Sequence, residues 1–152
     1  MPNYLMVLMA VSVGGMVVLQ AGSNALLGRL LGHPLSASLT SLGVSLAAVI
    51  IALLAFRVPL PAAAGIATTP WWGWLGGLFG AAYLTVAVML APQLGAATFL
   101  ACVVAGQMLM SALCDQFGWA GFSVRRLSPE GYLAIGLIIA GVVLLQWRGR
   151  VV

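Results

Sequence analysis

Residues 94–118 read LGAATFLACVVAGQMLMSALCDQFG, and this stretch decides how the chain folds. It is apolar and long enough to cross a bilayer as a helix, which takes about 20 residues. Within it, Gln107, Ser111 and Asp115 recur every four residues, so they lie along one side of the helix. A polar stripe costs free energy in lipid unless it meets a partner or water. The stretch therefore predicts a transmembrane helix whose polar side is covered by protein or faces a cavity.

The composition of the whole chain predicts an all-α integral membrane protein. Of its 152 residues, 63% are hydrophobic and 5% are charged, and the mean hydropathy is +1.16. Soluble domains carry about 25% charged residues. The formal net charge of +4 does not predict nucleic-acid binding, because the arginines are scattered over several helix ends. Membrane lipids, with their anionic headgroups, are the partners that such charges predict.

Turn signals divide the chain into five spans within a single transmembrane domain, residues 1–152. Gly32-His33-Pro34 ends the first span, Thr69 is expected to cap the third ahead of Pro70, and Ser128-Pro129-Glu130 opens the last. We expect residues 58–69 to form a non-helical loop and Pro92-Gln93 alone to separate the third and fourth spans. The spans cover about residues 4–31, 36–56, 70–90, 94–116 and 129–147.

Small and aromatic residues mark the expected packing surfaces. Serines, alanine and glycine crowd the start of the second span, between residues 36 and 45, and predict a close helix–helix contact. In the third span, Gly73-x-x-x-Gly77 and Gly76-x-x-x-Gly80 predict a groove for close backbone approach. Trp71, Trp72 and Trp74 form an interfacial anchor, and Trp74, the deepest of the three, is the one expected to face a cavity.

The arginines give no clear orientation in the membrane. Five spans place the termini on opposite sides, with three arginines on each side. Either a subtler signal or one short loop sets the orientation, or the chain inserts both ways. In the second case two copies would form an antiparallel dimer whose ten helices resemble the inverted repeats of larger transporters. The side of the N-terminus has Arg57, Arg125 and Arg126, and the other side has Arg29, Arg148 and Arg150.

Polar side chains inside the spans are the candidate binding residues. Asp115 is interpreted as a proton or cation site, as a partner of Arg29 or Arg125, or as an interfacial residue that faces water. The amides either line a cavity or hold helices together without a substrate. Gln20 and Asn24 lie four residues apart and share one face of the first span. The predicted substrate-binding residues are Gln20, Asn24, Trp74, Gln107, Ser111 and Asp115.

The chain does not look like an enzyme. Its one histidine, His33, lies in a predicted turn, and no nucleophile lies at a useful spacing from it. Cys102 and Cys114 would be about 18 Å apart on one helix, too far to bridge each other. We expect no catalytic residues, no metal ligands and no cofactor.

The order and spacing of several motifs resemble the YdcZ-type, five-helix, half-size proteins of the drug/metabolite transporter superfamily. The resemblance covers nearly the whole chain. The related four-helix small multidrug resistance proteins carry a buried Glu in their first helix, whereas the first span here has no acidic residue. The matching pieces are Gln20, Asn24 and Leu27, residues 33–37, 70–77 and 80–81, residues 94–98 and 104–107, Ser111, residues 115–118, Arg125-Arg126 and the glycines of the last span.

The resemblance implies a multi-pass protein of the bacterial cytoplasmic (inner) membrane. It implies transport of small metabolites or amphipathic compounds by alternating access, with the chain paired with itself as an antiparallel homodimer or with a homologous five-helix chain. The predicted partners are thus lipids, a small-molecule substrate and a second such chain. The alternative is a non-transporting scaffold or a subunit of a larger membrane complex.

Overall fold

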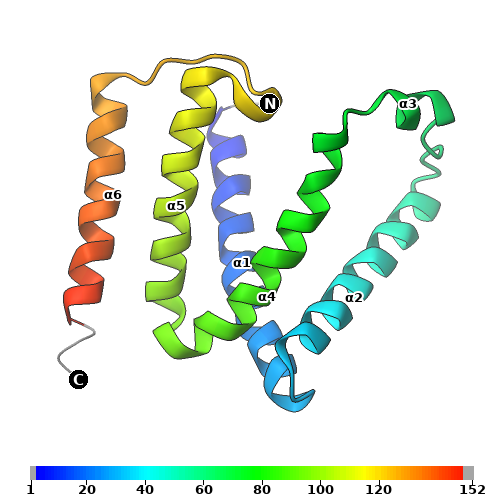
Figure 1. Ribbon diagram of the computed structural model, residues 1–152, viewed down its shortest axis with the longest axis horizontal. Coiled ribbons are helices and arrows are strands. Elements are labelled where there is room, and N and C mark those ends of the chain that lie inside the picture. The colour runs from blue at the N-terminus through cyan, green and yellow to red at the C-terminus, as the bar shows by residue number, and fades with distance from the viewer. Residues whose placement is uncertain (1–2, 149–152) are drawn as a thin grey trace. The chain divides into compact units, whose positions relative to one another are not determined.

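The computed structural model describes residues 3–148, and every regular element in that range is helical (Figure 1). Arg150, which was counted in the charge balance, lies outside the described residues, as does the side chain of Arg148. The elements are α1 (Asn3–Leu30), α2 (Pro34–Ala55), α3 (Ala63–Thr68), the 3₁₀ turn η1 (Trp71–Trp74), α4 (Leu75–Leu94), α5 (Ala96–Phe117), the 3₁₀ turn η2 (Trp119–Gly121) and α6 (Pro129–Arg148).

Five helical segments are long and apolar enough to cross a membrane, which confirms the predicted number of spans. They lie within two or three residues of the predicted bounds, except that the third continues further than expected. The segments are Tyr4–Leu30, Pro34–Ala55, Trp71–Leu94, Ala96–Phe117 and Pro129–Trp147.

The ends of the spans follow local capping chemistry. The ring nitrogen Nδ1 of His33 accepts a hydrogen bond from Leu35 N at 3.1 Å, so α2 begins at Pro34 rather than at the expected Ser36. Pro34 is tolerated there because a first helical residue needs no N–H. Ser128 caps α6 as predicted, with its Oγ accepting from Gly131 N at 3.3 Å.

The prediction that Pro92-Gln93 separates the third and fourth spans is wrong. α4 runs through Pro92 to Leu94, and only Gly95, with φ of +79°, lies before α5. A proline this close to a helix end removes one hydrogen bond and leaves little helix beyond it to disturb. The Gln93 side chain donates from Nε2 to Met89 O at 2.8 Å and so satisfies a carbonyl near the end of the helix.

Two expectations for the segment before the third span are also wrong. The loop contains the short helix α3, because its alanines are strong helix formers. Thr69 does not cap the next helix. Its hydroxyl donates back to Gly65 O at 2.8 Å, and the segment that follows starts as the 3₁₀ turn η1 with Pro70 before it.

The contacts divide the chain into two units, which we call the N-terminal unit (Met1–Gln93) and the C-terminal unit (Leu94–Val152). In the N-terminal unit α1 comes close to α4 and α2 at Gly28. A Cβ there would lie 2.6 Å from Val88 Cγ1 on α4 and 3.9 Å from the Ala37 Cβ on α2. Small residues on α1 and α2 therefore let three helices meet. The buried residues of this unit are Ala21, Asn24, Ala25, Ala37, Ser38, Leu84, Ala87, Val88 and Ala91.

The glycines predicted to form a groove on the third span are not where the close approach occurs. Nothing in the described chain lies within 4 Å of a Cβ placed at Gly76, Gly77 or Gly80. The contact predicted for the start of α2 is present in part, since Ala37 and Ser38 are buried whereas Ser36 and Ser45 are exposed.

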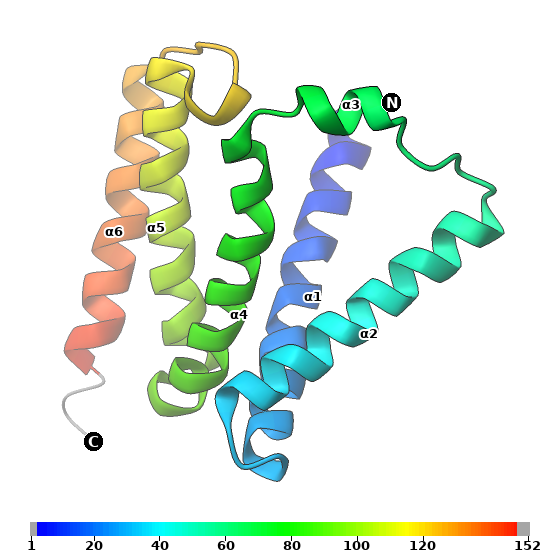
Figure 2. The same ribbon diagram turned by 45° about the vertical axis from the view of Figure 1, so that its right-hand side comes forward.

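The C-terminal unit is a hairpin of α5 and α6, which run side by side in opposite directions (Figure 2). Phe99 and Ala105 of α5 and Ile135 of α6 are its buried apolar residues. Gln146 donates from Nε2 to Cys102 Sγ at 3.6 Å and joins the two helices.

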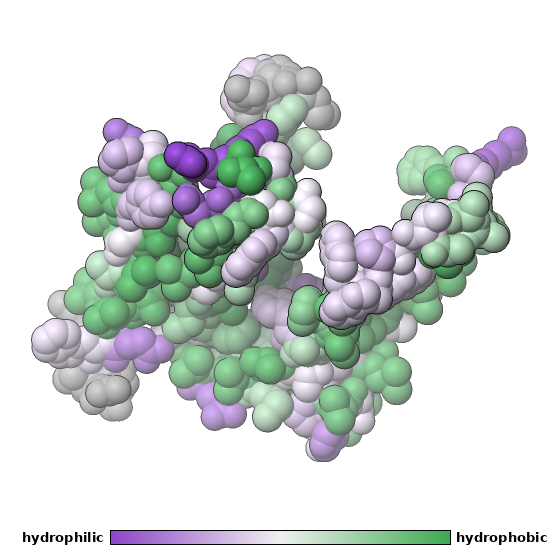
Figure 3. Space-filling view, turned by 45° about the horizontal axis from the view of Figure 1, so that its top comes forward, coloured by the Kyte–Doolittle hydropathy of each residue, from purple (hydrophilic) through white to green (hydrophobic). Residues whose placement is uncertain are grey.

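Most large apolar side chains on the spans are exposed within the chain. Leu39 is 75% exposed and Leu54 is 73% exposed, although both lie inside α2. Hydrophobic residues cover most of the visible helix surface in the space-filling view (Figure 3). Exposed apolar surface of this extent requires lipid or another protein to cover it.

Candidate functional site

The polar stripe of α5 lies on the side of the helix that faces away from α6. Gly95 and Gly118, both with positive φ, bound the helix and fix its length. Gly118 ends it in a left-handed cap whose N–H bonds to Cys114 O. Ala105 is buried against the hairpin, and Gln107 and Ser111 are placed by the 3.6-residue period on the opposite side.

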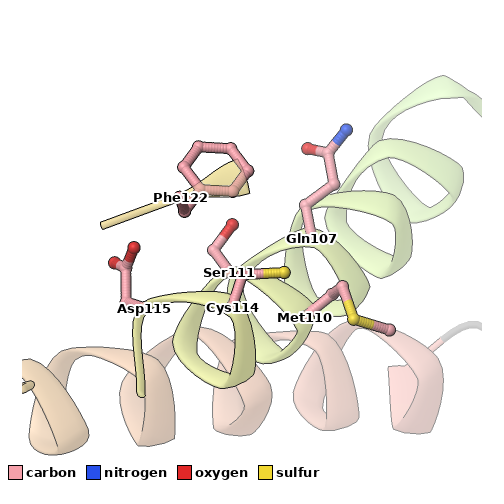
Figure 4. Close-up of a pocket in the computed structure, with 6 residues that line it drawn as sticks. All are labelled: Gln107, Met110, Ser111, Cys114, Asp115 and Phe122. Atoms are coloured by element: carbon pink, nitrogen blue, oxygen red, sulfur yellow. The ribbon is translucent and has the colours of Figure 1, made fainter. Parts of the chain in front are cut away.

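Gln107, Ser111 and Asp115 line one open pocket of about 380 Å³ within the C-terminal unit. Their side chains point to the same side of α5, with the Phe122 ring beside the Ser111 and Asp115 end (Figure 4). Gln107 and Ser111 are exposed and Asp115 is half-buried. The structure thus brings together three of the six predicted site residues, from one helix. The complete lining is Gln107, Met110, Ser111, Cys114, Asp115 and Phe122.

Phe122 reaches the pocket because the chain folds back after α5. Gly118, Ala120 and Gly121 have φ of +67°, +54° and +83°, which turns the backbone sharply. Arg125 N then donates to Asp115 O at 2.8 Å and ties the returning segment to the end of α5. Phe122 was not predicted from the sequence. The signal for it is Gly118, which precedes η2, together with Gly121, which ends it.

The same fold-back packs its own aromatic residues. The rings of Phe117 and Trp119 stack with centroids 5.3 Å apart and an interplanar angle of 27°. The Cβ of a residue at position 118 would lie 3.0 Å from Val124 Cγ2, so the returning segment lies close against the cap of α5. The wall of the pocket that carries Phe122 is therefore held by local packing.

The Asp115 carboxylate has no ion-pair partner within the described part of the C-terminal unit. Arg125 bonds only to the backbone carbonyl of Asp115, through its own N–H, and the Arg125 side chain is exposed. The predicted pairing with Arg125 is therefore not observed. An unpaired carboxylate that lines a pocket in a membrane protein attracts a cation, a proton or water.

The other three predicted residues belong to the N-terminal unit. Gln20 and Trp74 are exposed on α1 and η1. Asn24 is 3% exposed, and its Nδ2 has no hydrogen-bond acceptor among the described residues. A buried donor without an acceptor costs about 1–3 kcal/mol, so Asn24 lies inside the packing of α1 at a cost in stability.

A cross-helix hydroxyl pair that the sequence analysis did not identify lies in the same unit. Ser38 Oγ and Thr85 Oγ1 are 2.9 Å apart between α2 and α4. Ser38 Oγ also lies 3.1 Å from Pro34 O, and Thr85 Oγ1 lies 2.8 Å from Ala81 O. Each of these three contacts needs a donated hydroxyl proton, and the two side chains supply only two. The bond between α2 and α4 therefore forms only when one hydroxyl leaves its own helix backbone.

Among residues 3–148, no three side chains of His, Cys, Asp or Glu come close enough to hold a metal ion. Cys102 and Cys114 are both free thiols, and Cys114 lines the pocket. The pocket thus offers one carboxylate, one amide, one hydroxyl, two sulfur atoms and an aromatic ring.

Comparison with protein families gives one match. The family described as "Putative inner membrane exporter, YdcZ" matches residues 5–144, which includes all five spans except Tyr4 and the last residues of α6. Comparisons with curated proteins and with solved structures found no match.

Proposed function

Because the chain belongs to the YdcZ family of inner-membrane exporters, we propose that it exports small molecules by alternating access and that its substrate binds at the α5 pocket. Membership of the family confirms the predicted resemblance. Together with the five spans, it makes the chain a multi-pass protein of the inner membrane. Exporters are transporters rather than enzymes, and nothing in the described residues supplies a catalytic constellation.

The observation that carries the proposal is the Asp115 carboxylate, which lines the pocket of a membrane span and has no ion-pair partner within the described part of its unit. Ionisable groups inside spans are costly and mark ion or substrate pathways. Gln107 and Ser111, each one turn further along α5, extend the polar surface away from Asp115. The polar row runs along the direction in which a substrate would cross the membrane.

A second chain in the opposite orientation would complete the transport path. The equal division of the arginines, the exposed apolar faces of the spans and the open glycine face of α4 support this arrangement. Two inverted copies would supply two α5 pockets related by symmetry. Alternating access would then exchange the roles of the two copies, as in transporters with inverted repeats.

The test of transport uses the purified chain in proteoliposomes and a broad panel of radiolabelled metabolites and amphipathic compounds. We expect uptake of some compounds, and we expect Asp115→Asn and Gln107→Ala to reduce it at least tenfold. Gln116→Ala is the matched control, because Gln116 is the next residue on α5 and does not line the pocket. If nothing is moved and one stoichiometric partner co-purifies, the chain is a scaffold and the proposal is wrong.

The antiparallel arrangement has a separate test. Reporters that are active on one side of the membrane only are fused to the C-terminus of the chain. Activity of both reporters in the same cells supports two orientations. Activity of one reporter alone overturns the antiparallel homodimer and leaves pairing with an opposite-facing homologous chain to be sought by co-purification.

A further inference from the structure

We propose that the α5 pocket recognises protonated amines that bear a small aromatic or apolar group, in preference to quaternary ammonium, neutral or anionic compounds. This inference rests on the proposed function, since it names the substrate class of the same site. It follows from the order in which charge, hydrogen-bond acceptors and apolar surface are arranged around the pocket.

The charge of the pocket favours a cation. Asp115 is the only charged residue in the lining, and it forms no ion pair within the described part of its unit. Arg125 lies close in the chain, but only its backbone N–H contacts α5, at 2.8 Å from Asp115 O. A carboxylate without an ion-pair partner gains from a ligand that brings its own positive charge.

The acceptors of the pocket favour a cation that carries N–H groups. Asp115, Ser111 and Gln107 are spaced four residues apart, so neighbouring groups lie about 6 Å apart along the axis of α5. Each presents an oxygen that accepts hydrogen bonds, and none of these side chains bonds to another described side chain. A protonated primary amine has three N–H donors for such acceptors, whereas a quaternary ammonium has none. Charge attraction is common to both ions, and the hydrogen bonds distinguish them.

The remaining lining accommodates an apolar group. Phe122 stands beside the carboxylate end of the row, and the Met110 thioether and the Cys114 thiol complete the apolar part of the wall (Figure 4). An aromatic face attracts a cation and also stacks on an aromatic substituent. A volume of about 380 Å³ lies at the small end of the range for ligand sites. The site therefore fits a one-ring amine better than a large multi-ring compound.

The test measures binding of four probes of nearly equal size to the full chain in detergent by isothermal titration calorimetry at neutral pH. The probes are 2-phenylethylamine, its N,N,N-trimethyl derivative, the neutral 2-phenylethanol and the anion 3-phenylpropionate. We expect the primary amine to bind at least tenfold more tightly than the trimethyl derivative and the alcohol, and the anion to bind weakest.

The variants separate the contributions of the lining residues. Asp115→Asn should weaken binding of the amine at least tenfold and leave binding of the alcohol unchanged. Ser111→Ala should weaken the amine several-fold and reduce its advantage over the trimethyl derivative. Gln116→Ala should change neither value. Unchanged binding of the alcohol shows that a variant still folds, so a loss of amine binding is not explained by misfolding.

Each unexpected binding result contradicts one part of the proposal. Equal binding of the amine and the alcohol overturns charge recognition, and equal binding of the amine and the trimethyl derivative overturns the role of the acceptor row. If no probe binds but the proteoliposomes move another compound in a manner that depends on Asp115, the amine inference is wrong and the proposed function stands. If neither binding nor transport is seen, both the amine inference and the proposed function are wrong.

Discussion

The N-terminal unit buries two polar side chains in its packing, whereas the C-terminal unit leaves a polar row along an open pocket. Asn24 and Ser38 are almost fully buried near the contact of α1, α2 and α4. Gln107 and Ser111 are exposed on α5 and line a hollow of about 380 Å³. Helices α1 and α5 show the same sequence signal, which is polar residues four apart on an apolar span.

The difference arises from the residues that surround each stripe. On α1, alanines and Gly28 allow close approach, and Val88 fills the space next to Gly28. On α5, Ala105 is buried, and it lies one turn from Cys102, which accepts a hydrogen bond from Gln146 of α6, so the packed side and the polar side are opposite each other. A polar stripe predicts a binding surface only when the small residues of the same helix lie on its other side.

The largest effect that tests this comparison is at Gly28. Gly28→Ala places a Cβ 2.6 Å from Val88 Cγ1, and we expect the overpacking to destabilise the chain by about 1–3 kcal/mol. Gly22→Ala on the same helix meets nothing within 4 Å and should raise stability by up to about 1 kcal/mol. Thermal unfolding in detergent measures both variants. Val88→Ala combined with Gly28→Ala should recover stability, and failure to recover would show that Val88 is not the obstacle.

The next effect is at Gly118, which ends α5 and supports the segment that carries Phe122. Gly118→Ala puts a Cβ at φ of +67°, 3.0 Å from Val124 Cγ2, and we expect a loss of about 1–2 kcal/mol. The shift of the returning segment should also weaken binding of 2-phenylethylamine. Gly106→Ala on the same helix meets nothing within 4 Å and is the control. If both variants bind the amine equally, Phe122 does not contribute to the pocket.

The third prediction is that an apolar residue in place of the buried Asn24 raises the stability of the chain. Asn24→Leu removes a buried donor that has no acceptor, so we expect stability to rise by about 1 kcal/mol. Ser38→Ala breaks the bond to Thr85 at 2.9 Å and should lower stability by a similar amount. Both are measured by thermal unfolding. If Asn24→Leu is instead strongly destabilising, the amide has a partner that the described residues do not include.

Transport by Asn24→Leu adds a second readout. A variant that is more stable but transports less would assign the Asn24 amide a role in the transport cycle. A variant that is more stable and transports normally would restrict the site to α5.

The sequence was sufficient to predict the spans, because their length and hydropathy depend on the chain alone. It also predicted the Ser128 cap and the alignment of Gln107, Ser111 and Asp115, since both follow from local geometry. The prediction of a non-helical loop at α3 was wrong, because the alanines there favour a helix. The prediction that Pro92 ends the third span was wrong, because a proline near the end of a helix is tolerated. It could not predict the burial of Asn24, because that burial depends on helices distant in the sequence. It did not predict the placement of Phe122, because that placement depends on the positive φ of Gly118, Ala120 and Gly121, which turns the chain back.

The smallest effect tests whether the backbone of the segment that carries Phe122 is strained at Ala120. Ala120 has φ of +54° within the fold-back, and Ala120→Gly should stabilise the chain by up to about 1 kcal/mol, because glycine accepts this conformation without strain. Ala112→Gly, in the regular part of α5, should destabilise it by about 1 kcal/mol. Opposite signs in thermal unfolding would show that position 120 is strained, and equal losses would contradict it. If Ala120→Gly also weakens amine binding, the strained turn holds Phe122 in place, since a looser backbone would then leave the ring less well positioned.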